Sequence, residues 1–299
     1  MNMRNLLRIL LALALSAAAG GTLAQSCTIT TAATLSSGTN YNPFAAGFND
    51  TTGAFSITCT RPKGGQNKFP GTFYVGATNG LNYAGSRRLR LGATASYLSY
   101  ALYRTAAGCT TAWGNASVPE VFSLANSNTQ GNDLTTNPNP LTSGTSFCFR
   151  ITGGINTAPP GTYVDTIQVA VAESPTVIWG TAAVTFQTTI QPACLFLSTP
   201  SDMLLNYTSF QAGDATGTTS FETKCTNTTS YTVAFDTASG TILGLNYTLG
   251  VSPASGLGTG TAQIAPGHAV TATVPGGQAG TCAAGTCTNS VTRNVTISY

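Results

Sequence analysis

The chain has 299 residues, and only 7% of them are charged, against about 25% in a typical soluble protein. This low charge, together with many Gly, Thr, Ser and Asn residues, is typical of a secreted β protein rather than a cytosolic enzyme. The 12 basic and nine acidic residues nearly balance, which excludes the strong positive field of a nucleic-acid-binding protein. The length gives room for two domains, each with its own core.

The first residues have the pattern of a secretory signal peptide. Arg4 and Arg8 accompany an apolar run over residues 6–15, and small residues follow up to Ala24. We expect cleavage after Ala24, so that residues 1–24 form the signal peptide. The apolar run is far shorter than the about 20 residues that a membrane-spanning helix requires. The protein is therefore expected to be exported.

The cysteines of an exported protein enter an oxidising compartment, where disulfides form. A metal site is the competing interpretation, but the chain contains one histidine and no Cys-x-x-Cys pair. Four cysteines lie in each half, in the order Cys27, Cys59, Cys109, Cys148, Cys194, Cys225, Cys282 and Cys287. We therefore expect disulfides within each half, and no metal or other cofactor.

An internal repeat relates the two halves. Residues 40–59 (NYNPFAAGFNDTTGAFSITC) and 206–225 (NYTSFQAGDATGTTSFETKC) align without a gap and are identical at eight of twenty positions. A cysteine lies 32 residues before the last cysteine of the first copy and 31 before that of the second. This shared spacing favours the pairs Cys27–Cys59 and Cys194–Cys225. The pairs Cys109–Cys148 and Cys282–Cys287 have no support beyond lying within their halves.

Strands with period-two alternation also recur in both halves. Residues 98–102 match residues 245–249, and residues 72–75 match residues 231–235. About seven short strands per half and the lack of helical periodicity predict an all-β fold of two tandem β-sandwiches. The expected segments are 25–172 for the first domain, 173–190 for a connection and 191–299 for the second domain.

A last pair of strands differs between the halves. Residues 163–171 and 291–299 align without a gap, and 163–171 is followed by another alternating run, residues 184–190, whereas 291–299 is not. The aligned positions on one face are Tyr163/Val291, Asp165/Arg293, Ile167/Val295, Val169/Ile297 and Val171/Tyr299. We expect the second sheet to be open, with a groove along Val291, Val295, Ile297 and Tyr299 that a strand of another molecule fills. For residues 184–190 two interpretations stay open, a linker or a strand that closes the first domain.

Several motifs carry a resemblance to a known family. They are the first cysteine of each half with the second about 31 residues on, LSYALYR at 98–104, TAWG at 111–114 and PPGTYVDTIQVAV at 159–171. Together they resemble the spore coat protein U-like domain of archaic, Csu-type chaperone–usher pilins, more fully in the first half. The resemblance implies two immunoglobulin-like sandwiches, the C-terminal one incomplete and closed by donor-strand complementation.

The resemblance also implies partners and a location. A periplasmic pilus chaperone first supplies the missing strand, an adjacent pilin subunit then replaces it, and an outer-membrane usher exports the subunit. Two domains, with only Gln25 and Ser26 between the expected cleavage site and Cys27, imply a tip adhesin secreted through the periplasm to the fimbrium tip at the cell surface. Its role would be attachment to an unknown surface or receptor and biofilm formation.

Four apolar residues in the loops of the first half are candidates for contacting that target. They are Phe48, Leu81, Tyr83 and Ile155, in connections that we expect to point away from the second domain. Tyr41 and Phe44 recur as Tyr207 and Phe210 in the repeat and are expected in the core. Exposed apolar loop tips suit adhesion to hydrophobic surfaces, and ordinary loop packing is the competing interpretation.

The sequence predicts no enzyme. His268 is the sole histidine and lies in a Pro-Gly turn, so no Ser/His/Asp or Cys/His set can form in the first half. The other interpretation is a secreted spore-coat-like structural or carbohydrate-binding protein whose domains are complete. In such a protein Arg87, Arg88 and Arg90 could bind an acidic polysaccharide. It would be monomeric when expressed alone, whereas a subunit with an open sheet edge requires its chaperone.

Overall fold

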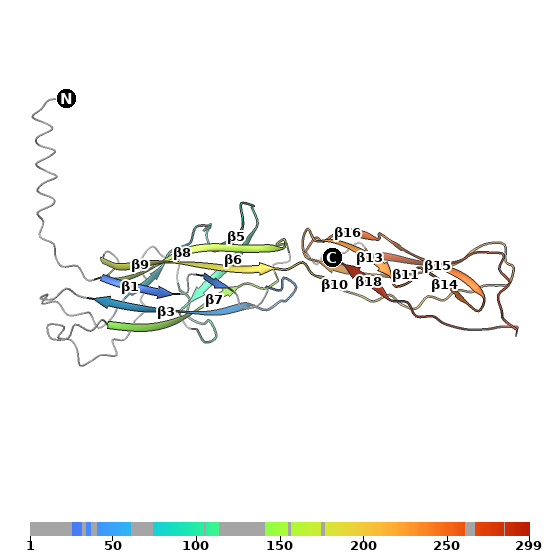
Figure 1. Ribbon diagram of the computed structural model, residues 1–299, viewed down its shortest axis with the longest axis horizontal. Helices are drawn as coiled ribbons and strands as arrows, with labels where there is room; N and C mark the ends of the chain where they lie inside the picture. The colour runs from blue at the N-terminus through green and yellow to red at the C-terminus, as the bar shows by residue number, and fades with distance from the viewer. Residues whose placement is uncertain are drawn as a thin grey trace, which may run out of the picture.

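The computed structural model describes residues 26–31, 34–36, 41–60, 74–104, 106–113, 141–154, 157–174, 177–260, 267–283 and 285–299. These residues form strands and loops and no helix, which confirms the expected all-β class. No helix in this part of the chain is long and apolar enough to cross a membrane. The expected signal peptide, residues 1–24, lies outside the described residues. Two elongated halves lie end to end, with β1 to β9 in one and β10 to β18 in the other (Figure 1).

The first half is built around one large sheet. Its strands are β1 (Ser26–Thr31), β2 (Thr34–Ser36), β3 (Asn49–Thr60), β4 (Tyr74–Ala77), β5 (Arg87–Leu91), β6 (Tyr97–Tyr103), β7 (Leu141–Ile151), β8 (Gly161–Ser174) and β9 (Val177–Ile190). Their order is β1-β3-β7-β6-β5-β8-β9-β2, and β4 also pairs with β8. The sheet curls so that β1 returns against β9, where Gly180 lies against the backbone carbonyl of Cys27. A side chain at position 180 would not fit this close approach.

Strand β9 contains the run 184–190, for which the sequence left two interpretations open. It pairs antiparallel with β8 from Gly161 to Ser174 and parallel with β2 along its other edge. Val184, Phe186 and Ile190 are buried, and the ring of Phe186 stacks on Phe149 with centroids 4.8 Å apart. The run is therefore a strand of the first sheet, and its apolar face completes the core there.

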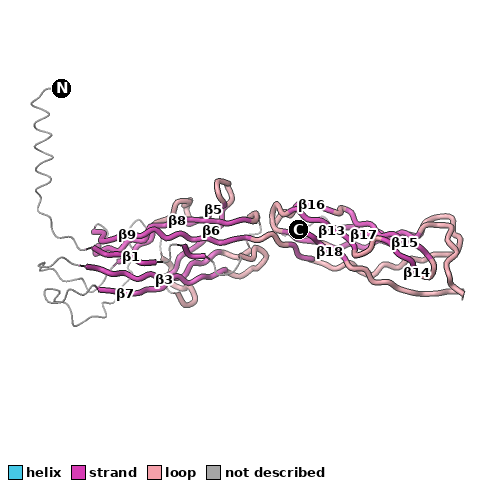
Figure 2. The backbone as a smooth tube through the Cα atoms, viewed as in Figure 1, coloured by secondary structure: helices cyan, strands magenta, loops and turns pink. Residues whose placement is uncertain are grey.

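The second half consists of smaller sheets (Figure 2). Its strands are β10 (Cys194–Phe196), β11 (Ala215–Phe221), β12 (Thr223–Cys225), β13 (Ser230–Phe235), β14 (Ser239–Ile242), β15 (Leu245–Ser252), β16 (Ser255–Leu257), β17 (His268–Val274) and β18 (Val295–Ser298). One sheet has the order β11-β17-β15-β14, a second has the order β16-β13-β18, and β10 pairs with β12. Strand β18 is thus an edge strand.

Four disulfides form, and each joins two cysteines of the same half. Cys27–Cys59 joins β1 to β3, and Cys194–Cys225 joins β10 to β12. In both, the cysteines are directly opposite in an antiparallel pair with Cα atoms 4.0 Å apart, which extends the internal repeat to the three-dimensional structure. The other two disulfides are Cys109–Cys148 and Cys282–Cys287.

Candidate functional site: an open sheet edge in the second half

Strand β18 occupies in the second half the place that β8 occupies in the first. Strand β8 pairs with β4 through Ala77 opposite Val169, and β18 pairs with β13 through Val233 opposite Ile297. Val169 and Ile297 are aligned positions in the sequence, so β4 and β13 flank the same edge of equivalent strands. The opposite edges of β8 and β18 are therefore equivalent as well.

The other edge of the two strands differs. Strand β8 carries β9 along that edge, whereas no strand of the described part of the second half pairs with the corresponding edge of β18. Residues 199–208, which precede β11, form no strand either. In the first half β2 pairs with β9 at this place, so the missing partner of β18 also leaves the segment before β11 without a strand to join.

The burial of the side chains follows this difference. In β8, Tyr163, Ile167, Val169 and Val171 are at most 1% exposed. In the aligned positions, Val295 and Ile297 are partly buried against a core cluster around Phe221 and Val233, whereas Val291 is 47% exposed and Tyr299 61% exposed. Of the predicted groove residues, Val295 and Ile297 therefore lie on the incompletely covered face of β18, and Val291 and Tyr299 flank this strand. Met203, from the segment before β11, packs on the same cluster, which the sequence did not indicate because that segment does not alternate.

In both halves a tyrosine hydroxyl bonds a charged side chain at an aligned position, and this side chain is acidic in the first half and basic in the second. In the first half the Tyr100 hydroxyl donates to Asp165 Oδ2 over 2.8 Å, and the backbone N–H of Leu81 donates to Asp165 Oδ1. Burial raises the pKa of Asp165 and that of Tyr100. In the second half Arg293 Nε donates to the Tyr247 hydroxyl over 2.7 Å. The carboxylate of the first half is thus replaced by a guanidinium.

The loop that follows Tyr41 and carries Phe48 lies next to the second half, as do the residues just before β8, so the expectation that these connections point away from it is wrong. Strand β9 ends at Ile190, next to the second half, and Tyr41 pairs with Ile190. Lys224 Nζ lies 5.1 Å from the ring centroid of Phe44, and Asn227 Nδ2 donates to the carbonyl of Thr157 over 2.6 Å. The expectation fails because the start of β8, antiparallel to β9, lies at the junction.

The candidate surface residues themselves do not form one group. Phe48 is 62% exposed and lies under the guanidinium of Arg150, at 4.3 Å. Leu81 is 81% exposed, and its turn covers Asp165 through backbone hydrogen bonds. Tyr83 is 39% exposed, and Ile155 lies outside the described residues. Of the two residues expected in the core, Tyr41 is buried, whereas Phe44 is only half-buried.

The cationic stretch of β5 is occupied by contacts within the protein. Arg87 is buried and donates to the carbonyls of Ala77, Thr78 and Trp113. Arg88 lies over the ring of Tyr97, and Arg90 donates to the carbonyls of residues 93 and 94. These side chains stabilise the turns on either side of β5.

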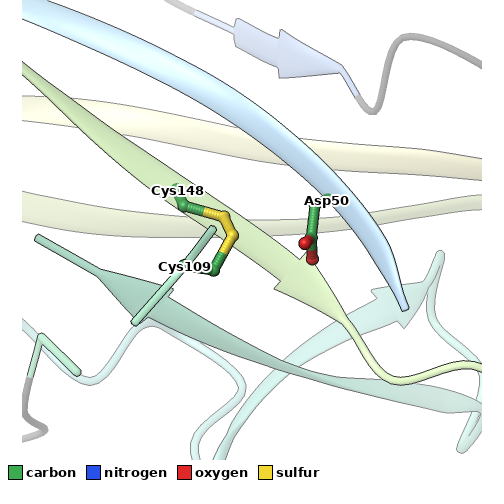
Figure 3. Close-up of side chains that lie close together, drawn as sticks. All are labelled: Asp50, Cys109 and Cys148. Carbon is green, nitrogen blue, oxygen red and sulfur yellow. A yellow bond between two sulfur atoms is a disulfide. The ribbon is translucent and has the colours of Figure 1, made fainter. Parts of the chain in front are cut away.

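Two other clusters of reactive residue types are structural. Asp50, Cys109 and Cys148 approach one another within 4.8 Å, but both sulfur atoms belong to one disulfide and offer no thiolate to a metal (Figure 3). Asp50 is instead the ion-pair partner of Arg150. His268 is fully buried and stacks on Phe221 with ring centroids 4.9 Å apart, and its ring nitrogens bond Thr223 and the carbonyl of Pro253. It serves the core of the second half.

Comparisons with solved structures find chains of low sequence identity. The chaperone–tip adhesion subunit pre-assembly complex CsuC–CsuE of Acinetobacter baumannii is 14% identical, covering 92% of this chain and 100% of that one, with a TM-score of 0.44. The CupB6 tip adhesin of Pseudomonas aeruginosa is 10% identical, covering 86% and 90%, with a TM-score of 0.38. The CooA pilin subunit of enterotoxigenic Escherichia coli is 9% identical, covering 56% and 99%, with a TM-score of 0.35.

No curated protein matches the chain. The family model of the Spore Coat Protein U domain matches residues 12–170, which is more than half of the 299 residues. This range contains the motifs at 98–104 and 111–114, and all but the last residue of the motif at 159–171, on which the resemblance rests. The chain therefore belongs to the spore coat protein U domain family, a family of structural subunits and not of enzymes.

Proposed function

We propose that the protein is a subunit of a chaperone–usher fimbria whose second domain, residues 191–299, accepts a β-strand from another protein along β18. The observation that carries this proposal is the comparison of β18 with β8. Both strands have the same neighbour on one edge, and only β8 has a strand on the other. A bound strand would stand where β9 stands in the first half.

The physical reason for such a partner is the cost of an open edge. Unpaired backbone N–H and C=O groups along β18 offer a template for aggregation, and Val295 and Ile297 remain partly in contact with water. An added strand pairs these groups and covers the apolar side chains. A periplasmic chaperone would supply the strand during export, and an adjacent pilin subunit would replace it at the outer-membrane usher.

The first half suits a different role, because β9 already lies along the edge of β8. We infer that the first domain, residues 25–172 with the strand that follows, is the adhesin-like part of the subunit. In a fimbrium tip it would contact a surface or receptor and promote attachment and biofilm formation. Phe48, Leu81 and Tyr83 are exposed enough to take part, although the loop that carries Phe48 lies next to the second half.

Size-exclusion chromatography and thermal unfolding of the mature chain test the proposal. We expect the chain alone to aggregate, and to elute as a one-to-one complex when co-expressed with the periplasmic chaperone or mixed with a donor-strand peptide. A chain that is monomeric by itself, and whose melting temperature no added strand changes, would show that the second domain is complete. A secreted coat or carbohydrate-binding protein would then be the better account.

A matched pair of substitutions on β18 refines this test. Ile297→Asp places a charge on the partly buried face, and Thr296→Asp places the same charge on the exposed face. We expect the complex to be lost with Ile297→Asp and retained with Thr296→Asp, because only the first charge would be buried by the incoming strand.

A further inference from the structure

The proposed strand-binding edge contains a cation, Arg293, and this residue restricts what can bind. Resting on the proposed function, we propose that the strand bound along β18 carries a carboxylate side chain that faces Arg293, between positions that are apolar or small. The partner is thus an extended segment with one inward-facing Asp or Glu. In the first half a strand, β9, already lies in the equivalent place.

Strand β9 gives the register of such a segment. Ala182, Val184, Phe186 and Thr188 lie opposite Val169, Ile167, Asp165 and Tyr163 of β8, in that order. The aligned residues of the second half are Ile297, Val295, Arg293 and Val291. A strand bound in the same register would therefore place the counterpart of Phe186 opposite Arg293.

No carboxylate of the described residues forms an ion pair with Arg293. Its guanidinium donates to the Tyr247 hydroxyl, and its central carbon lies 5.7 Å from the Tyr247 ring centroid. Among the described residues the one ion pair joins Arg150 to Asp50, in the first half. Asp236 bonds Asn294, the neighbour of Arg293 whose side chain is on the exposed face. Within the part of the chain that the structure describes, Arg293 thus has a hydrogen bond but no ion-pair partner.

A bound strand would change the solvation of Arg293. It would exclude water from a guanidinium that is only half-buried in the free chain, and a buried charge without a partner is costly. In the first half the charge of Asp165 is met by donors of its own chain, so the residue opposite can be Phe186. The second half offers Arg293 one hydroxyl. A carboxylate of the partner would supply the missing bonds, in the bidentate geometry that guanidinium favours.

Two peptides test the proposal with the mature chain. The first has the β9 sequence, residues 177–190, and the second carries Phe186→Glu. We expect the Phe186→Glu peptide to bind at least about fivefold more tightly, as measured by titration calorimetry, and the preference to fall with added salt. The Arg293→Gln variant should lose this preference and the Arg293→Lys variant should keep it, which separates an effect of charge from an effect on folding.

The outcomes separate the two proposals. Both peptides could bind while the wild-type chain and the Arg293→Gln variant show the same preference for the Phe186→Glu peptide. This result would overturn the carboxylate inference and leave the open edge intact. Binding of neither peptide, by a chain that is stable and monomeric, would overturn the open edge and the carboxylate inference together.

Discussion

The two halves of the protein contain equivalent strands, β8 and β18, that differ in their neighbouring strands. In the first half, Ile167 and Val169 of β8 are almost fully buried because β4 covers one edge and β9 the other. In the second half, Val295 and Ile297 of β18 have the same alternation and one neighbouring strand, and they stay half-buried. Alternation therefore decides which face of a strand is apolar, whereas its neighbours decide whether that face is buried.

The cores show the same difference on a larger scale. Among the described residues, 25 buried side chains of the first half form one cluster that includes Phe186 and Val184 of β9. In the second half, five buried residues around Phe221 and three around Tyr247 form separate clusters, each flanked by partly buried apolar residues. The second core is the one that an additional strand would enlarge.

The largest effect is expected from shortening a buried side chain of β9 in the first half. Phe186→Ala removes a ring that stacks on Phe149 and contacts Tyr100, and should destabilise the first domain by about 3–5 kcal/mol. Chemical denaturation would measure the loss. Thr181→Ala, on the exposed face of the same strand, is the control and should change stability by less than about 0.5 kcal/mol. Similar effects of both substitutions would show that β9 does not complete the core.

The equivalent disulfides provide a second comparison. Replacing Cys27 and Cys59 by alanine opens a loop of 32 residues, and replacing Cys194 and Cys225 opens one of 31. The chain-entropy model gives about 3–4 kcal/mol for each pair. We expect the second domain to lose its cooperative unfolding transition and the first to keep it at a lower temperature, because the second core is smaller. Calorimetry of the two double variants measures this, and the reverse order would contradict the comparison.

Asp165 should make the stability of the first half depend on pH. Burial raises the pKa of Asp165 in the folded state, so the folded chain holds this proton more tightly than the unfolded chain. Its contribution is full below the unfolded value of about 3.9 and is lost as the pH rises through the folded pKa. Asp165→Asn should flatten the stability of the first domain between acid and neutral pH, as measured by urea denaturation across that range. An unchanged slope in this variant would assign the dependence to other groups.

A smaller effect is expected from shortening an apolar side chain on the open edge strand, β18. Ile297→Ala should cost the bare chain about 1 kcal/mol, because the side chain is only partly buried, and more once a strand covers it. Thermal unfolding with and without a donor-strand peptide gives both values. Thr296→Ala, on the exposed face, is the matched control and should respond in neither state. An equal loss at Ile297 in both states would mean that the strand does not cover it.

The smallest effect is expected at the surface. Leu81→Ser should leave the stability of the first domain within about 0.5 kcal/mol, because the side chain is exposed and the turn is held by its backbone. Adhesion of the purified chain to hydrophobic beads then tests whether Leu81 contacts a target. Unchanged adhesion in Leu81→Ser, and likewise in Phe48→Ser, would remove these residues from the candidate surface.

Several features of the protein were predictable from the sequence because they depend on local pattern or on spacing. The period-two alternation predicts strands and their apolar faces, as in residues 163–171 and 291–299. The internal repeat and the shared cysteine spacing indicate two related units and the pairs Cys27–Cys59 and Cys194–Cys225. The low charge and the motifs led to the family that the family model then confirmed.

Other features depend on which distant segments meet, and the tertiary structure alone decided them. Residues 184–190 read equally well as a linker, because alternation does not say which strand they join, and only the pairing with β8 and β2 places them in the first sheet. The direction of the loop around Phe48 was predicted wrongly for the same reason. The contact of Arg293 with Tyr247 joins residues 46 positions apart, and the sequence carries no local signal for it.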